Sequence, residues 1–402
     1  MTVQDTSGDS SVQRPAASDG ESRKNALAGI KREEIIFVLP GKGDKQGSYL
    51  IFSLSEDPTA NGDKPFVLNI VQCKQHELAD DLSGFVLSQD SSPPTHLSSP
   101  RELHVVVSTG SGLRRAETFY QEVLCPLLDA VGLQPSESED ARGYRVTVTK
   151  NSSTIREFAR ELGADAGAGG KTVVLLSGDG GVVDLLNGLD HASHPPRTPT
   201  IALLPLGTGN ALFHSLHKPH YSTGAENPGG PSPLSDTPAY RVHGDKRFGM
   251  AAGELLKVGH AYDARVEVHG GDGGGRRGGG RGRGKFNYVL ATLVSNLEKT
   301  FTISPAGRPL DGRLRLVYFG DVGGDKTMQI MMAAYRDGAH VAMPEVGYEE
   351  VEEVRVTVDE DDPRWRKVCI DGSIVELEKG GWMRVEREEG TRLKVLVDAG
   401  TD

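Results

Sequence analysis

The strongest constraint on the fold of this chain is a pair of glycine-rich turns, each preceded by an apolar run and followed by a helical pattern. The first reads VVLLSGDGG from residue 173, and the second reads IALLPLGTGN from residue 201. This layout is typical of a buried strand that delivers a backbone loop to the N-terminus of a helix. Such a loop offers N–H groups and the positive end of the helix dipole to a phosphate, and glycine lets the backbone approach the anion without a Cβ in the way. The sequence therefore predicts two phosphate-facing loops, the first of which carries the carboxylate of Asp179.

The segments around these turns alternate between strand and helix patterns. Leu103–Val107 and Tyr144–Val148 are typical of strands, and Arg114–Val131 and Thr154–Leu162 have helical periodicity. Alternation of this kind predicts an α/β fold with a doubly wound, Rossmann-like parallel sheet and a site at the carboxyl ends of its strands. A strand, a glycine turn and a helix also occur in such folds simply to reverse the chain, so either turn alone is weak evidence for a phosphate site.

The composition changes along the chain and predicts its division into regions. We expect disorder over residues 1–28, a small β-rich N-terminal extension over 29–87, a linker over 88–101, the α/β catalytic domain over 102–217, a loop over 218–239 and an antiparallel β-sandwich domain over 240–398. The last β-like run, RLKVLV at residues 392–397, is assigned to the sandwich. Residues 269–285 form a Gly/Arg-rich insertion, interpreted as a flexible hairpin loop, with an RNA-binding element as the weaker alternative.

Composition also excludes several classes of protein. A chain of 402 residues, 37% of them hydrophobic, is long enough for two domains with real cores. A formal net charge of −11 argues against general nucleic-acid binding. The three cysteines are scattered, which favours reduced thiols and no zinc site. No apolar stretch approaches the ~18 residues of a membrane span, and the polar N-terminus lacks a signal core. We therefore expect a cytoplasmic protein with at most a peripheral contact with intracellular membranes.

The two turns together resemble the catalytic domain of the diacylglycerol kinase and sphingosine kinase family. SGDG followed by a helix with Asn-Gly-Leu is similar to the family's GGDGT-type loop, and LPLGTGNAL is similar to its GTGN loop. The resemblance runs with gaps from about residue 103 to residue 385. Ser177 and Ala211 favour the sphingosine kinase branch, closest to the sphingoid long-chain base kinases of fungal type. Residues 310–314 and 335–340 match further landmarks and are interpreted as structural turns.

The resemblance implies a lipid kinase that transfers the γ-phosphate of ATP to the primary hydroxyl of a lipid, with ATP and Mg²⁺ bound between the two domains. A sphingoid long-chain base at a membrane surface is the favoured substrate, and diacylglycerol is the alternative. Asp179 is the candidate catalytic base, and its other interpretation is a turn carboxylate that bonds its own backbone. Asp371, in a sequence similar to the family's Asp-Gly-Glu, or Asp184 lies near the Mg²⁺, which is otherwise held by the ATP phosphates. The candidate nucleotide-binding residues are Ser108, Gly110, Ser111, Gly112, Thr149, Ser177, Gly178, Gly180, Gly207, Thr208, Gly209, Asn210, Arg241, Arg247 and Asp371.

Several positions depart from the family. Ser108 and Thr109 stand where the family has Asn-Pro, Gly181 replaces a Thr or larger residue, and Ser373 replaces an acidic residue. The segment that holds the sphingoid amine in sphingosine kinases is replaced by about 21 loop-like residues, with Leu234 where an Asp is expected. The lipid-binding half of the site is therefore shortened. A divergent enzyme, a catalytically impaired nucleotide-binding paralogue and a truncated gene product all fit this pattern.

Overall fold

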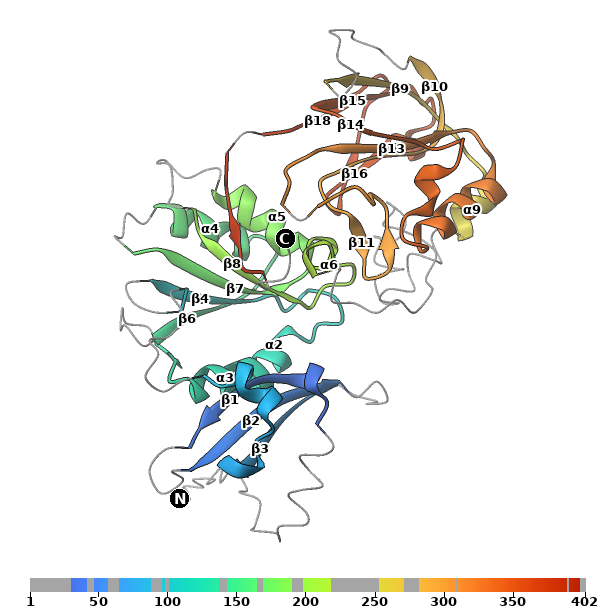
Figure 1. Ribbon diagram of the computed structural model, residues 1–402. Coiled ribbons are helices and arrows are strands. Elements are labelled where there is room, and N and C mark those ends of the chain that lie inside the picture. Colours follow the sequence, from blue (N-terminus) through green and yellow to red (C-terminus); the bar gives the residue numbers. More distant parts are fainter. Residues whose placement is uncertain are drawn as a thin grey trace, which may run out of the picture. The chain divides into compact units, whose positions relative to one another are not determined.

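The computed structural model divides the chain into two compact units, Met1–Pro93 and Pro94–Asp402 (Figure 1). It describes residues 30–41, 47–56, 65–87, 96–97, 101–136, 143–164, 169–189, 198–217, 253–270, 282–308, 310–388 and 390–397. The predicted disorder over 1–28 and loop over 218–239, with most of the linker and of the Gly/Arg-rich insertion, lie outside these residues. Within the described residues, no helix is both long enough and apolar enough to cross a bilayer.

The first unit contains a three-stranded antiparallel sheet in the order β1–β2–β3. Val38, Ile51 and Cys73 form the buried centre of one face, one residue from each strand. This sheet confirms the β-rich N-terminal extension. Its elements are η1 (Arg32–Glu34), β1 (Ile35–Pro40), β2 (Ser48–Glu56), β3 (Phe66–Lys74), η3 (Gln75–Glu77) and η4 (Asp80–Phe85).

The second unit begins with a six-stranded sheet in the order β19–β8–β7–β4–β6–β5, and every neighbouring pair is parallel. The strands are β4 (Glu102–Val107), β5 (Gln134–Pro135), β6 (Gly143–Val148), β7 (Lys171–Ser177), β8 (Thr200–Pro205) and β19 (Lys394–Val395). Strand β4 comes first in the chain and lies between β6 and β7, so the strand order reverses at β4. Ligands of open α/β sheets bind at such a switch point, outside the carboxyl ends of the strands.

Helices cover both faces of this sheet. Along β4, Val106 packs in the core under α4 and α5, whereas Val105 and Val107 pack in the core under α2 and α3. The alternation places the two cores on opposite faces, and Figure 1 shows the helix pairs on the two sides. The helical segments are α2 (Ala116–Phe119), the π-turn η5 (Tyr120–Leu124), α3 (Cys125–Ala130), α4 (Thr154–Ala164), α5 (Asp179–Leu189) and α6 (Ala211–His217). The helix predicted over 114–131 is therefore present but interrupted by a π-turn directly before Pro126, which has no N–H to continue the α-helical bonds.

A six-stranded antiparallel sheet forms the rest of the second unit, in the order β14–β13–β10–β9–β15–β18. On β13, Leu316 packs toward the β16–β17 hairpin and Val317 packs toward α9, so both faces are covered. The elements are β9 (Tyr262–His269), β10 (Arg283–Thr292), β11 (Asn296–Glu298), β12 (Phe301–Thr302), β13 (Arg315–Gly320), α9 (Gly324–Ala334), η7 (Ala339–Ala342), β14 (Gly347–Glu350), β15 (Glu353–Val358), η8 (Pro363–Trp365), β16 (Lys367–Ile370), β17 (Ser373–Glu376) and β18 (Trp382–Glu386). The predicted fold class, a parallel α/β domain followed by antiparallel sheets, is confirmed. Below, residues 253–388 are called the β lobe, and residues 101–217 with 391–397 the α/β lobe.

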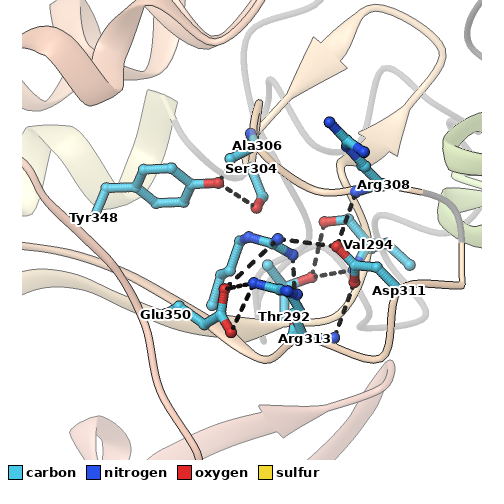
Figure 2. A network of polar contacts seen from close by, with 10 residues as sticks. Thr292, Val294, Ser304, Ala306, Arg308, Asp311, Arg313, Tyr348 and Glu350 are labelled. Carbon is cyan, nitrogen blue, oxygen red and sulfur yellow. Dashed lines mark hydrogen bonds and ion pairs between the residues drawn. The ribbon is translucent and has the colours of Figure 1, made fainter. Parts of the chain in front are cut away.

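A network of ion pairs closes one end of the antiparallel sheet (Figure 2). The carboxylate of Asp311 accepts bonds from the N–H of Arg313 at 2.9 Å and from the guanidinium of Arg315 at 2.9 Å. Burial disfavours the charged carboxylate, but these bonds outweigh it and hold the pKa of Asp311 below its ordinary value. Arg313 extends the network to Glu350 at 3.0 Å. This end of the β lobe is therefore a structural turn, in agreement with the interpretation of residues 310–314.

The end of the chain departs from the predicted arrangement. The run at 392–397, assigned to the sandwich, returns to the α/β lobe and adds β19 in parallel to β8. The N–H of Leu396 donates to the carbonyl of Ile201 at 2.8 Å, and Leu393 and Val395 pack against the core under α4 and α5. A β-like run carries no information about its partner strand, so the sequence alone could not distinguish the two sheets.

Removal of this strand should destabilise the α/β lobe. A chain that ends at residue 390 loses the partly buried Leu393 and Val395, and we expect a loss of about 2 kcal/mol. That loss corresponds to a fall in Tm of about 4–8 °C, measured by calorimetry. A chain that ends at residue 397 keeps β19 and serves as the control. Equal Tm values for the two truncated chains would show that β19 contributes nothing.

Candidate active site

Three loops meet at the switch point of the parallel sheet, one after each of the strands β4, β7 and β8. A Cβ on Gly178 would lie 2.8 Å from the Cα of Gly207, so the loops after β7 and β8 touch backbone to backbone. Gly112 has φ +50°, and a Cβ there would overlap the carbonyl oxygen of Leu206. These three glycines are needed for close packing between loops. The packing brings together the predicted residues Ser108, Gly110, Ser111, Gly112, Ser177, Gly178, Gly180, Gly207, Thr208, Gly209 and Asn210.

Gly180 is different from these glycines, because a Cβ built on it would have no atom within 4 Å. It is the second residue of α5, and the first N–H groups of a helix have no acceptor within the helix. Space beside free N–H groups at the positive end of a helix is what a phosphate needs. Of the glycines in the SGDG segment, Gly180 therefore has the geometry predicted for anion binding.

The carboxylate of Asp179 is bonded to the helix that follows β8. Its Oδ2 accepts the N–H of Ala211 at 2.8 Å, and its Oδ1 accepts the N–H of Leu212 at 3.0 Å. The carboxylate thus caps α6 instead of bonding its own turn, and the role of Asp179 as catalytic base stays a prediction. Each oxygen retains a second lone pair, so the carboxylate can still accept a proton or bind a cation while it holds α6.

Asn210 uses its side chain inside the loop. Its Oδ1 accepts the N–H of Gly207 at 2.9 Å, its Nδ2 donates to the carbonyl of Gly207 at 3.0 Å, and the residue has φ +53°. Gly207 and Asn210 were predicted to offer backbone N–H groups to phosphate. The structure instead uses the N–H of Gly207 to close the loop, so this group is not free for a ligand. Thr149 has a similar role: its Oγ1 accepts the N–H of Thr109 at 2.9 Å and braces the loop after β4.

The β lobe contributes a second carboxylate. Asp371 has φ +46° and Gly372 has φ +82°, the two left-handed positions of a tight turn between β16 and β17. The Asp371 side chain is accessible to solvent, yet the surrounding protein removes part of its bulk water, and this raises its pKa. The negative charge of Asp179 raises the pKa further. Asp371 and Asp179, from two different lobes, therefore lie near enough for their charges to interact.

A buried polar contact that sequence reasoning missed holds the two lobes together at this point. The N–H of Asn296 donates to the Oγ of Ser215 on α6 at 3.0 Å, and Asn296 is 1% exposed. The carbonyl of Leu297 lies 3.1 Å from the position of a Cβ on Gly209, so the β lobe lies directly against the GTGN loop. The sequence carries no signal for this contact, because Asn296 makes it through its backbone N–H, whereas its side-chain amide bonds to Glu298 and Thr302 within the β lobe.

The remaining predicted site residues lie elsewhere or outside the described residues. Asp184 accepts a bond from the guanidinium of Arg156 on α4 at 2.8 Å, so it joins two helices. Arg241 and Arg247 lie outside the described residues. Within the part of the chain that the structure describes, no group of three or more His, Cys, Asp or Glu side chains could hold a metal ion. Of the two predicted metal neighbours, Asp371 is the one that faces Asp179.

Comparisons with known proteins bear on the family of the α/β lobe and on the fold. Residues 102–227 match the family model of the diacylglycerol kinase catalytic domain. Among solved structures, the chain is similar to a protein from Bacillus anthracis str. Sterne described as "a putative diacylglycerol kinase", with 13% identity, 75% of this chain and 98% of that chain covered, and a TM-score of 0.50. A second structure with the same description has 13% identity, the same coverage and a TM-score of 0.49. At this identity the likeness shows the fold alone. No curated protein sequence matches the chain.

The resemblance to the diacylglycerol kinase catalytic domain is thus confirmed for residues 102–227. The sphingoid-base branch stays a prediction.

The two facing carboxylates predict a gain in stability when one charge is removed. Because folding raises the pKa of Asp371, the folded state disfavours its ionised form, and this penalty is present at neutral pH and disappears in acid. We expect Asp371→Asn, which tolerates the same backbone conformation, to raise Tm at pH 7 in the absence of ligand. The gain should be smaller in an Asp179→Asn background, since the repelling charge is then absent whereas the loss of bulk water around residue 371 remains. A gain of equal size in both backgrounds would contradict the proximity of the two groups.

His214 on α6 predicts acid sensitivity. Burial, followed by the charges of Lys299 and His217, lowers the pKa of His214 to about 4. The unfolded chain therefore binds this proton more tightly, so the free energy of unfolding should fall as the pH decreases from about 6.5 to about 4. Urea unfolding at several pH values should show a shallower fall for His214→Gln than for the wild type. Parallel pH profiles would exclude His214 as a source of the acid sensitivity.

Proposed function

We propose that the protein is an ATP-dependent lipid kinase that transfers the γ-phosphate to the primary hydroxyl of a lipid. The observation that carries the proposal is the arrangement at the switch point, where the open N-terminus of α5 at Gly180 lies beside the carboxylate of Asp179. The first feature suits a phosphate and the second suits removal of a proton from an alcohol. The match of residues 102–227 to a kinase catalytic domain supports the same chemistry.

Asp179 would act as the base from a fixed position. The two N–H bonds from α6 orient its carboxylate, and a lone pair on each oxygen remains for the acceptor hydroxyl. A positioned base of this kind typically contributes about 10²–10⁴-fold to the rate. The close contact of the loops at Gly178 and Gly207, where a Cβ on either residue would clash, places this base beside the phosphate loop.

The residues present fit a divalent cation that arrives with the nucleotide. Loss of bulk water, followed by the negative charge of Asp179, raises the pKa of Asp371, so a cation beside the two carboxylates would be favoured. Asp371 is the side chain that would hold Mg²⁺, directly or through water, together with the ATP phosphates. Bound Mg²⁺ would supply neutralisation of the charge on the phosphates during transfer.

A sphingoid long-chain base is the proposed acceptor, and diacylglycerol is the alternative. Ser177 and Ala211 support the sphingoid base through the resemblance of the loops. The excess negative charge at Asp179 and Asp371 also suits an acceptor that carries an ammonium group, whereas diacylglycerol is neutral. The enzyme would meet its lipid at a membrane surface through a peripheral contact.

A second candidate function is nucleotide binding without phosphoryl transfer. The observation in its favour is that both oxygens of Asp179 already accept backbone bonds, which makes the residue useful to the fold without any catalysis. The shortened sequence at 218–239 also favours nucleotide binding without transfer to a lipid.

The test is transfer of labelled γ-phosphate from ATP to sphingosine, dihydrosphingosine and diacylglycerol in mixed micelles. We expect labelled sphingosine from the wild type and at least a 10²-fold lower rate from Asp179→Asn, since the amide cannot take the proton. Asp129→Asn, a matched change on α3 away from the three loops, should leave the rate unchanged. Calorimetry should show Asp179→Asn folded, because its amide oxygen can still accept one bond from α6. ATP binding with no labelled lipid would overturn the kinase and favour the second function.

A further inference from the structure

Three serine hydroxyls connect the loop after β4 to the end of β7. The Oγ of Ser111 donates to the Oγ of Ser108 at 2.8 Å, and the Oγ atoms of Ser111 and Ser177 lie 3.0 Å apart. Ser177 is 6% exposed, whereas Ser108 and Ser111 are half-buried. The three hydroxyls thus run from the interior of the sheet to the surface of the switch point.

We propose that Ser177, Ser111 and Ser108 form a hydroxyl chain with a single direction of donation, which ends in an O–H donor at Ser108 for a phosphate oxygen of the nucleotide. The proposal rests on the proposed function and adds a role for Ser177 that acts through the other two side chains. Ser177 is therefore a positioning residue, and Ser108 is the group that meets the ligand.

The direction follows from the number of protons. A serine hydroxyl has one hydrogen to donate and two lone pairs to accept. Ser111 gives its hydrogen to Ser108, so the contact between Ser111 and Ser177 requires Ser177 to be the donor. The hydroxyl hydrogen of Ser108 takes no part in either bond and is left for an acceptor other than these three hydroxyls. Hydroxyls in series polarise one another, which makes the last one a better donor to an anion.

The backbone fixes the end of the chain at the switch point. The N–H of Ser108 donates to the carbonyl of Leu176 at 3.0 Å, and its carbonyl accepts the N–H of Ser111 at 3.2 Å. Two residues further along the same loop, Gly110 has no atom within 4 Å of a Cβ position.

Gly181 is the residue that makes room for the inner end of the chain. A Cβ at Gly181 would lie 2.7 Å from the Cβ of Ser177 and would overlap its Oγ. The hydroxyl at 177 and the glycine at 181 are therefore complementary in size.

The test compares two probes on the full-length protein: the non-hydrolysable ATP analogue AMP-PNP, which carries phosphates, and adenosine, which does not. Ser177→Ala removes the first donor without touching the ligand. We expect its Kd for AMP-PNP to rise about 3- to 10-fold, the effect of losing one hydrogen bond, with the Kd for adenosine unchanged. Ser304→Ala is the matched control, since Ser304 is 1% exposed and has a hydrogen bond to the Tyr348 hydroxyl at 2.8 Å, away from the loops. It should leave both constants unchanged.

A double variant separates donation from packing. Gly181→Ala should lower Tm through the overlap with Ser177, and Ser177→Gly in the same chain should restore Tm by removing the overlapping atoms. The double variant still lacks the hydroxyl, so its affinity for AMP-PNP should remain low. Recovery of that affinity would show that Ser177 contributes only to packing and would overturn the proposed hydroxyl chain. An equal loss of affinity for AMP-PNP and adenosine in Ser177→Ala would overturn it as well. If the wild type failed to bind AMP-PNP, the proposed function itself would be overturned, together with the proposed hydroxyl chain.

Discussion

The contact between Gly178 and Gly207 is the central packing contact at the carboxyl edge of the parallel sheet, where the loops, Asp179 and α6 meet. Two backbones cross there without intervening side chains, so the loops after β7 and β8 pack directly against each other. That crossing carries Asp179 to the start of α6, where its carboxylate meets the N–H groups of Ala211 and Leu212. The helix in turn presents Ser215 to Asn296 of the β lobe. A backbone contact of two glycines thus sets the position of the second lobe against the GTGN loop.

The charge distribution around this contact explains why the region is suited to a cationic or metal-bound ligand. In the ion-pair network at Asp311, guanidinium and N–H donors outweigh burial and the pKa is lowered. At Asp371 the loss of bulk water acts in the same sense, but the neighbouring charge is the carboxylate of Asp179 and the pKa is raised. Among the described residues, Asp311 is thus paired with cationic partners, whereas Asp371 lies near a second carboxylate. Two neighbouring carboxylates cost stability and are retained most readily where a ligand restores the balance.

Much of this arrangement could be predicted from the sequence because it depends on local patterns. Apolar runs that end in glycine turns predicted the parallel strands, and their alternation with helices predicted a site at the carboxyl edge of the sheet. What could not be predicted depends on partners far away in the chain. The bond from Asp184 to Arg156 joins α5 to α4, and the return of β19 to β8 spans the whole second unit. Neither leaves a signal at the residues themselves, since an acidic residue on a helix and a short β-like run have many possible partners.

Retention of the SGDG and GTGN segments is, on this geometry, weak evidence for catalysis. Packing alone would preserve Gly178 and Gly207 because their backbones touch, and capping of α6 alone would preserve Asp179. A protein that had lost its activity would keep these residues for its stability. Packing does not account for the open space beside Gly180 or for the carboxylate of Asp371 near that of Asp179. Evidence for function must therefore be sought at residues that packing does not explain, and at the switch point these are Gly180, Asp371 and the proposed hydroxyl donor of Ser108.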